Sequence, residues 1–188
     1  MVAGSVKRFT TDEFHRLGEL GFFDDGPVEL IRGELIEMSP KRTPHSVCNT
    51  WLVKQLILLL GERAMVRGQE PIALSDLSEP SPDVVVVKYR QDDYLAGHPG
   101  AEDCWVVMEI SDSTLGYDRS KKLSLYAESG VVNYWIFNLV NRQLEVYREP
   151  YQDSHGDYGY RQKLTYLPTE KVELPLGDCV LALDGVFP

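Results

Sequence analysis

Pro82-Asp83-Val84-Val85-Val86-Val87 is the stretch that decides the fold, together with Trp105-Val106-Val107-Met108-Glu109-Ile110 further along the chain. β-Branched residues dominate these runs, and the four valines show no polar alternation, which is typical of strands buried on both faces of a sheet. The polar segment 88–103 connects the two runs. We therefore expect two central strands, each with one acidic residue in or beside an apolar run.

More strands are expected on both sides of this pair. Residues 28–38 place apolar residues around a central Arg32-Gly33, which predicts a β-hairpin with Gly33 in the turn. Later strands are expected at residues 133–139, 143–148 and 160–166.

Three segments have helical patterns. A mostly buried helix is expected from His45 to about Leu60, and a short capped helix near Thr11. A third is expected from Asp118 to Ser129, with Asp118 as its N-cap. Helices alternating with strands predict an α/β fold, a mixed central β-sheet flanked by helices, in a single domain over residues 1–188.

The overall charge limits the functions that fit. The chain has 188 residues and a net charge of −10, which argues against a protein that holds nucleic acid over its whole surface. Residues 41–67 nevertheless contain five basic side chains and one acid. This segment is the best candidate for a surface that faces phosphates.

The compartment can be inferred from the cysteines and the apolar runs. Three cysteines lie far apart without a CxxC pair, which fits a reducing compartment. The N-terminus does not resemble a signal peptide, and the longest apolar run, Leu56 to Leu60, falls well short of the roughly 18 residues that cross a bilayer. We expect a cytoplasmic location and no membrane partner.

Glu109 is the most unusual residue of the apolar runs. A buried carboxylate costs several kcal/mol unless it is paired, protonated or bound to a metal. If Asp83 lies on an adjacent strand, the two acids repel each other, and a divalent cation such as Mg²⁺ relieves that repulsion. The alternatives are a salt bridge from Glu109 to an arginine such as Arg119, and a turn role for Asp83 after Pro82.

A cation that orients an attacking water would complete a hydrolytic site. The natural position for it is 111, on the same face as Glu109, but Ser111 stands there. Lys122 lies next to the inward face of the expected helix, and its alternative is a solvated lysine. His45 is a further candidate as a general base, or as a helix-start residue whose ring bonds nearby backbone.

Several motifs in order resemble one known family. They are Glu29-Leu30-Ile31-x-Gly33-Glu34-Leu35, Pro44-His45-Ser46, Pro82-Asp83, Glu109-Ile110-Ser111-Asp112-Ser113-Thr114, Tyr117-Asp118-Arg119-x-x-Lys122-Leu123-x-x-Tyr126-Ala127-x-x-Gly130-Val131 and Tyr134-Trp135-Ile136. Together they resemble the Uma2 family, also called DUF820, of the PD-(D/E)xK superfamily. The likeness spans roughly residues 10 to 180 and implies a restriction-endonuclease-like fold.

The resemblance also implies a chemistry. Asp83 and Glu109 would bind Mg²⁺, with Mn²⁺ able to replace it, and Lys122 would position the water that cleaves a DNA phosphodiester. Glu29 matches a recurring acid of the hairpin and would be a further metal ligand or a base that holds water, and Glu34 is the alternative candidate for this extra acid. The superfamily's habits suggest a homodimer that presents two sites to two strands.

A second hypothesis belongs to another class, because family membership does not guarantee catalysis. The chain would then be a catalytically silent module that binds nucleic acid or protein on the same scaffold, which the net charge of −10 favours in its protein-binding form. Serine-hydrolase, phosphate-loop and zinc-protease chemistry are poorly supported, since GxSxG, GxxxxGK and HExxH do not occur.

Overall fold

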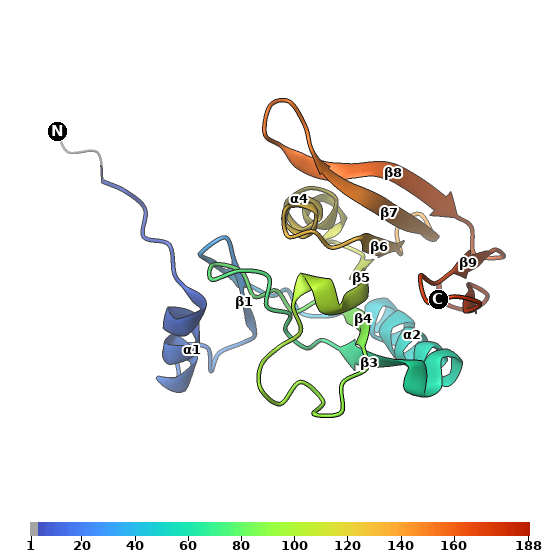
Figure 1. The fold of residues 1–188 in the computed structure, drawn as a ribbon, viewed down its shortest axis with the longest axis horizontal. Helices are drawn as coiled ribbons and strands as arrows, with labels where there is room; N and C mark the ends of the chain where they lie inside the picture. The colour runs from blue at the N-terminus through green and yellow to red at the C-terminus, as the bar shows by residue number, and fades with distance from the viewer. Residues whose placement is uncertain (1–3) are drawn as a thin grey trace.

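A six-stranded mixed sheet forms the centre of the computed structural model, which describes residues 4–188 (Figure 1). Its strand order is β3-β4-β5-β6-β7-β8. The strands are β3 (Ala64–Gly68), β4 (Val84–Lys88), β5 (Cys104–Ser111), β6 (Asn133–Asn138), β7 (Gln143–Gln152) and β8 (Tyr158–Tyr166). β5 and β6 run parallel, whereas the other neighbouring pairs are antiparallel. The expected α/β fold with a mixed sheet is confirmed.

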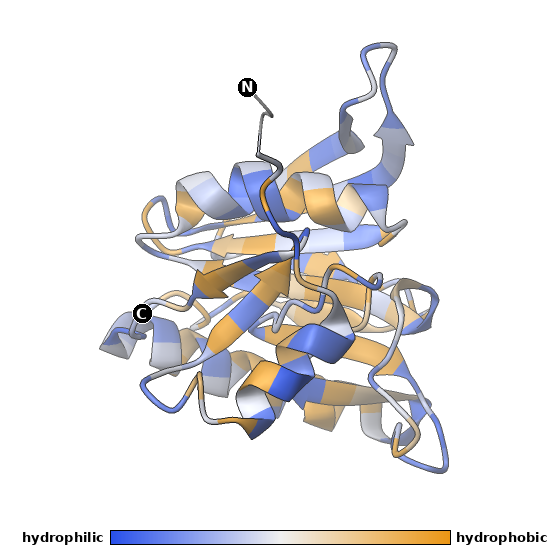
Figure 2. Ribbon diagram, turned by 90° about the vertical axis from the view of Figure 1, so that its left-hand side faces the viewer, coloured by the Kyte–Doolittle hydropathy of each residue, from blue (hydrophilic) through white to orange (hydrophobic). Residues whose placement is uncertain are grey.

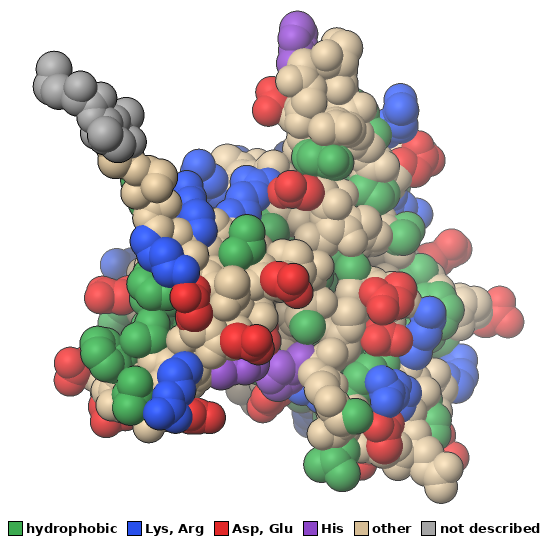
Figure 3. All heavy atoms as spheres, turned by 60° about the vertical axis from the view of Figure 1, so that its left-hand side comes forward, with side chains coloured by type: hydrophobic (Ala, Val, Ile, Leu, Met, Phe, Trp, Pro, Cys, Tyr) green, Lys and Arg blue, Asp and Glu red, His purple; other side chains and the backbone are tan. Residues whose placement is uncertain are grey.

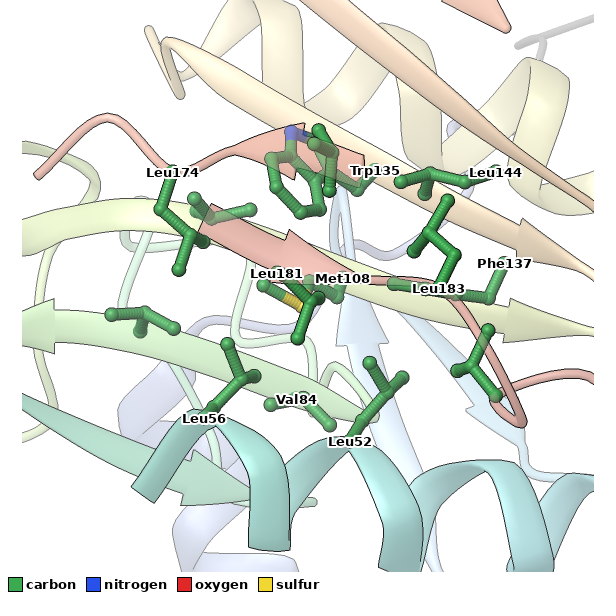
Figure 4. Close-up of a cluster of buried hydrophobic side chains, with 14 of the residues drawn as sticks. Leu52, Leu56, Val84, Met108, Trp135, Phe137, Leu144, Leu174, Leu181 and Leu183 are labelled. Atoms are coloured by element: carbon green, nitrogen blue, oxygen red, sulfur yellow. The ribbon is translucent and has the colours of Figure 1, made fainter. Parts of the chain in front are cut away.

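One face of the sheet is covered by α2 (Thr43–Leu60) and by the C-terminal hairpin of β9 (Lys171–Glu173) and β10 (Val180–Ala182). Leu52 and Leu56 of α2 meet Val84, Met108 and Trp135 in this core (Figure 4). Because side chains alternate along a strand, Val85 and Val87 point to the opposite face and are equally buried. Two buried faces explain the four consecutive valines.

The opposite face is covered by the connection between β5 and β6. Because these two strands are parallel, the chain must cross over the sheet between them. It consists of α3 (Leu115–Tyr117), a π-helical turn η3 (Asp118–Lys122) and α4 (Leu123–Glu128). The expected helix is therefore present but begins earlier. The prediction that Asp118 is its N-cap is wrong, because Asp118 lies inside the helical segment.

A separate hairpin of β1 (Val28–Ile31) and β2 (Glu34–Glu37) lies outside the central sheet (Figure 1). Gly33 has a φ of +77° in its turn, as expected. A bridge between Leu30 and Glu79 attaches the hairpin to the loop before β4. This contact brings β1 close to the ends of the central strands.

The remaining elements are short. They are α1 (Thr11–Glu19), which begins after the N-cap Thr10, and the 3-10 turns η1 (Gly61–Arg63) and η2 (Ala101–Asp103). Hydrophobic residues concentrate in the central strands, whereas the end of the β7–β8 hairpin is hydrophilic (Figure 2). Among residues 4–188, no helix combines the length and apolar character needed to cross a membrane.

Candidate active site

A pocket of about 340 Å³ brings together Glu29, Asp83, Glu109 and Lys122. These four residues come from β1, the segment before β4, β5 and η3, so the pocket lies where the hairpin meets the central sheet. All four side chains are buried in its floor. The structure thus groups every site residue that the sequence analysis selected.

Lys122 connects two of the acids. Its Nζ donates hydrogen bonds to Oε1 of Glu109 at 2.9 Å and to Oε1 of Glu29 at 3.0 Å. Burial alone would lower the pKa of Lys122, but the nearby carboxylates of Glu109, Glu29 and Asp118 raise it above its ordinary value. Lys122 is therefore a buried cation and not a solvated helix lysine.

The π-helical turn supplies this lysine. Five residues, Asp118–Lys122, form η3 between α3 and α4. π-Turns are rare and are found frequently at functional sites, because the wider turn re-aims the side chains that follow it. Both ends of the turn, Asp118 and Lys122, are buried and line the pocket.

Glu109 also accepts a hydrogen bond from the hydroxyl of Tyr126 at 2.7 Å. Burial raises its pKa to about 8; Lys122 opposes this shift, while the acids Asp83, Asp118 and Glu29 add to it. The alternative of a salt bridge to Arg119 is wrong, because Arg119 pairs with Glu145 on β7. Glu109 instead shares its lysine with a second carboxylate.

Asp83 is held by three groups. Its Oδ2 accepts the backbone N–H of Ile110 at 2.9 Å and lies 3.0 Å from Nε2 of His45, while Nζ of Lys41 lies 3.6 Å from Oδ1. Burial works to raise the pKa of Asp83, but His45, the Ile110 amide and Lys41 together lower it below its ordinary value. Asp83 is therefore a buried, fixed carboxylate rather than a free turn residue.

Two features of this pocket were not predicted from the sequence. The His45 ring binds Asp83 and not nearby backbone, a contact between residues 38 positions apart. Asp118 accepts hydrogen bonds of 2.7 Å from both Ser111 and Thr114. The sequence held one indication of the contact between Ser111 and Asp118: Ser111 lies two residues after Glu109, so both side chains are on the same face of the strand.

The hairpin contributes Glu29 and not Glu34. Oε1 of Glu29 also accepts the backbone N–H of Ser81 at 2.8 Å, so this side chain is fixed inside the pocket. Glu34 is exposed and pairs with Arg8 instead. In the hairpin register Glu29 stands opposite Ile36, whereas Glu34 stands opposite Ile31 in the pair next to the turn.

The carboxylates of Asp83, Glu109 and Glu29 offer the oxygen ligands that a hard divalent cation prefers. Asp83 Oδ1, Glu109 Oε2 and Glu29 Oε2 accept no hydrogen bond from residues 4–188. None of these oxygens is among the fully buried polar atoms that lack a partner, so each keeps some exposed surface. In the described part of the chain, however, no group of three or more potential ligand side chains is already gathered around one point.

The basic residues of 41–67 do not form one surface, which corrects the sequence expectation. Lys41 and Arg42 line the pocket. Arg63 instead bonds the carbonyls of Leu59 and Leu60 at the far end of α2, and the Arg67 side chain is mostly buried. Figure 3 shows basic and acidic side chains interspersed over one face of the molecule.

These features define an α/β protein with an acid–lysine pocket at the junction of a mixed sheet and a separate hairpin. A family model matches residues 11–179, that of Uma2, described as "Putative restriction endonuclease", and the chain belongs to this family. The fold is similar to the crystal structure of a "putative nuclease belonging to DUF820" from Anabaena variabilis ATCC 29413. That likeness has a TM-score of 0.70 at 16% identity and covers 95% of this chain and 97% of the other. The comparison with curated proteins gave no match. The family description points to a nuclease, and the structural neighbour shows that the fold is shared.

Proposed function

We propose that this protein is a Mg²⁺-dependent endonuclease that hydrolyses DNA phosphodiester bonds through a metal-activated water. The observation that carries this proposal is the contact of one buried ammonium group, Lys122, with Glu109 and Glu29 in a pocket that Asp83 also lines. Acids that bind a cation and a lysine that positions water are the parts that such hydrolysis requires.

Asp83 and Glu109 would hold the metal, with Glu29 as a further oxygen ligand. When bound, Mg²⁺ would lower the pKa of water and stabilise charge on the phosphate. His45 and the Ile110 amide keep Asp83 in place, while Tyr126 orients Glu109. Lys122 donates hydrogen bonds only, so it would align the attacking water and favour the negative charge that develops.

A specific observation also favours the catalytically silent module. Lys122 already compensates Glu109 and Glu29, and within residues 4–188 no cluster of three ligand side chains is gathered for a metal. A purely structural role, stabilising the scaffold, would account for these ion pairs without catalysis. The two candidate functions differ in metal binding and in the effect of removing Lys122 on DNA cleavage.

Calorimetric titration with Mn²⁺ is the first test. The nuclease proposal expects a site in the wild type that is lost in Asp83→Ala. A folded wild type that binds neither Mn²⁺ nor Mg²⁺ favours the silent module.

Nicking of a supercoiled plasmid with Mg²⁺ is the second test. Lys122→Met is expected to slow nicking by ~10²–10³-fold, the range for removing one donor that stabilises developing charge. The matched control is Lys121→Met, the exposed neighbour of Lys122, which should nick like the wild type. Equal nicking by the wild type and by Lys122→Met contradicts the assigned role.

Two expectations from the sequence stay predictions. The three free, buried cysteines agree with a reducing compartment, so the proposal places the protein in the cytoplasm. A homodimer with two sites is checked by measuring the mass of the protein in solution.

A further inference from the structure

The pocket is small relative to the substrate of a nuclease. Its volume of about 340 Å³ is near the lower end of the ~300–1,000 Å³ range of pockets that enclose one small molecule. Glu109, Asp83 and Lys122 are at most 6% exposed in its floor. A scissile phosphate must therefore enter the pocket to reach these groups, and an intact duplex is too wide to follow it.

The walls suit a single nucleotide. Ile36 lies directly opposite Glu29 in the hairpin register, so these two side chains share one face of the hairpin. Ile36, Met38 and Tyr117 are half-buried and line the pocket beside the acids. One side of the pocket thus offers apolar and aromatic surface for a base, while the floor carries the groups expected to meet its phosphate.

The charge of the pocket opposes a long polyanion. Six acidic side chains line it, and the basic ones are Lys41, Arg42 and Lys122. Lys122 is hydrogen-bonded to two carboxylates. Lys41 and Arg42, in contrast, lie at the longer distances of 3.6 Å from Asp83 and 3.8 Å from Asp112, so they are the basic groups that can turn to phosphates. Their side chains are 28% and 72% exposed. With a net charge of −10 on the whole chain, contacts along many phosphates would be repulsive.

We infer that the substrate is single-stranded DNA, such as a flap or a strand end, with one nucleotide inserted in the pocket and its base against Tyr117. This inference rests on the proposed nuclease function and specifies its substrate class. Lys41 and Arg42 hold the phosphates beside the inserted nucleotide. A relaxed, continuous duplex is a poor substrate because a nucleotide can enter the pocket only after unpairing, whereas a supercoiled plasmid, as used in the nicking test, unpairs more readily.

Cleavage of matched DNA substrates tests the substrate class. A labelled single strand, a duplex with a single-stranded flap and a relaxed closed circle of duplex are incubated with the full chain and Mg²⁺. We expect the first two to be cut at least ~10-fold faster than the circle, with cuts in the flapped DNA confined to the unpaired part. Equal or faster cutting of the relaxed circle overturns the inference but leaves the nuclease function intact.

Binding tests the same inference without cleavage, so it remains decisive if no substrate is cut and the nuclease function fails. Fluorescence anisotropy with a short single strand should give a higher affinity than with a duplex of equal length. Two phosphate contacts predict a slope of about −1.4 for log K against log salt concentration. Equal affinity for the duplex, or a slope near −5 as for about six contacts on duplex DNA, overturns the inference.

Variants of Tyr117 test the position of the base. Tyr117→Ala should weaken single-strand binding by about 5- to 140-fold, whereas Tyr117→Phe keeps the ring and most of the affinity. Tyr89→Ala is the control, since Tyr89 is exposed and does not line the pocket. Unchanged binding by a folded Tyr117→Ala contradicts the assigned stacking role.

Discussion

Nζ of Lys122 lies 2.9 Å from Oε1 of Glu109, although the two residues are 13 positions apart and belong to different elements, η3 and β5. The same nitrogen lies 3.0 Å from Oε1 of Glu29, 93 positions away. The lysine therefore joins the separate hairpin to the central sheet through one buried ion-pair network. This network is a structural contact as well as the candidate machinery, so its loss should affect stability.

Lys122→Met is expected to destabilise the fold by ~3–5 kcal/mol, because it leaves two carboxylates buried without their cation. Urea unfolding at pH 7 measures the loss. The control Lys121→Met changes an exposed residue and should stay within about 0.5 kcal/mol of the wild type. A further Glu109→Gln change should restore part of the stability, and strictly additive losses contradict direct coupling.

The central strands and their two acids could be predicted from the sequence for a physical reason. Asp83 and Glu109 stand out because an apolar strand makes a carboxylate costly, and this cost is visible in the pattern of neighbours. The valine run indicates burial on both faces in the same direct way. Features that are caused by neighbouring residues in the sequence could thus be predicted.

Features that depend on contacts between residues far apart in the sequence could not be predicted. Arg119 faces Glu145 and not Glu109, a choice decided by how η3 crosses the sheet. The same holds for His45, whose partner Asp83 is brought near by α2 packing on β4. Helical periodicity did not predict the π-turn of Asp118–Lys122 either. Contacts set by tertiary packing leave little trace in local patterns.

His45 is expected to act through Asp83. A partner that orients a metal ligand typically contributes ~10–100-fold in metal affinity, so His45→Ala should weaken Mn²⁺ binding by that factor in calorimetry. His15→Ala is a matched control, because His15 forms a similar contact of 2.8 Å with Glu79 outside the pocket. Equal Mn²⁺ affinity in both folded variants contradicts the positioning role.

Glu145 should make stability depend on acid pH. Burial works to raise its pKa, but hydrogen bonds from Arg119, Lys163 and Asn138 outweigh it and hold the pKa of Glu145 well below its ordinary value of 4.5. A lowered folded-state pKa contributes stability that is present above the unfolded value and lost as pH falls below it.

Glu145→Gln isolates this contribution. The difference in free energy of unfolding between the wild type and this variant should be largest near pH 7 and shrink below about pH 4.5. Urea unfolding from pH 7 to pH 3 measures it. Glu62→Gln, at an exposed position, should show no such trend. A constant difference across this range contradicts the assigned cause.

Gly33 fixes the hairpin that carries Glu29. Its φ of +77° disfavours any residue with a Cβ, and an added Cβ would lie 2.6 Å from Cβ of Arg8. Gly130 has a similar φ of +80° but nothing within 4 Å of the added atom. Gly130→Ala therefore measures the backbone cost alone, ~1–2 kcal/mol, and Gly33→Ala should cost clearly more in urea unfolding. Equal losses would mean that Arg8 moves aside freely.

Because β1 also holds Glu29 against Lys122, we expect Gly33→Ala to weaken Mn²⁺ binding in calorimetry and Gly130→Ala to leave it unchanged, under conditions where both variants remain folded.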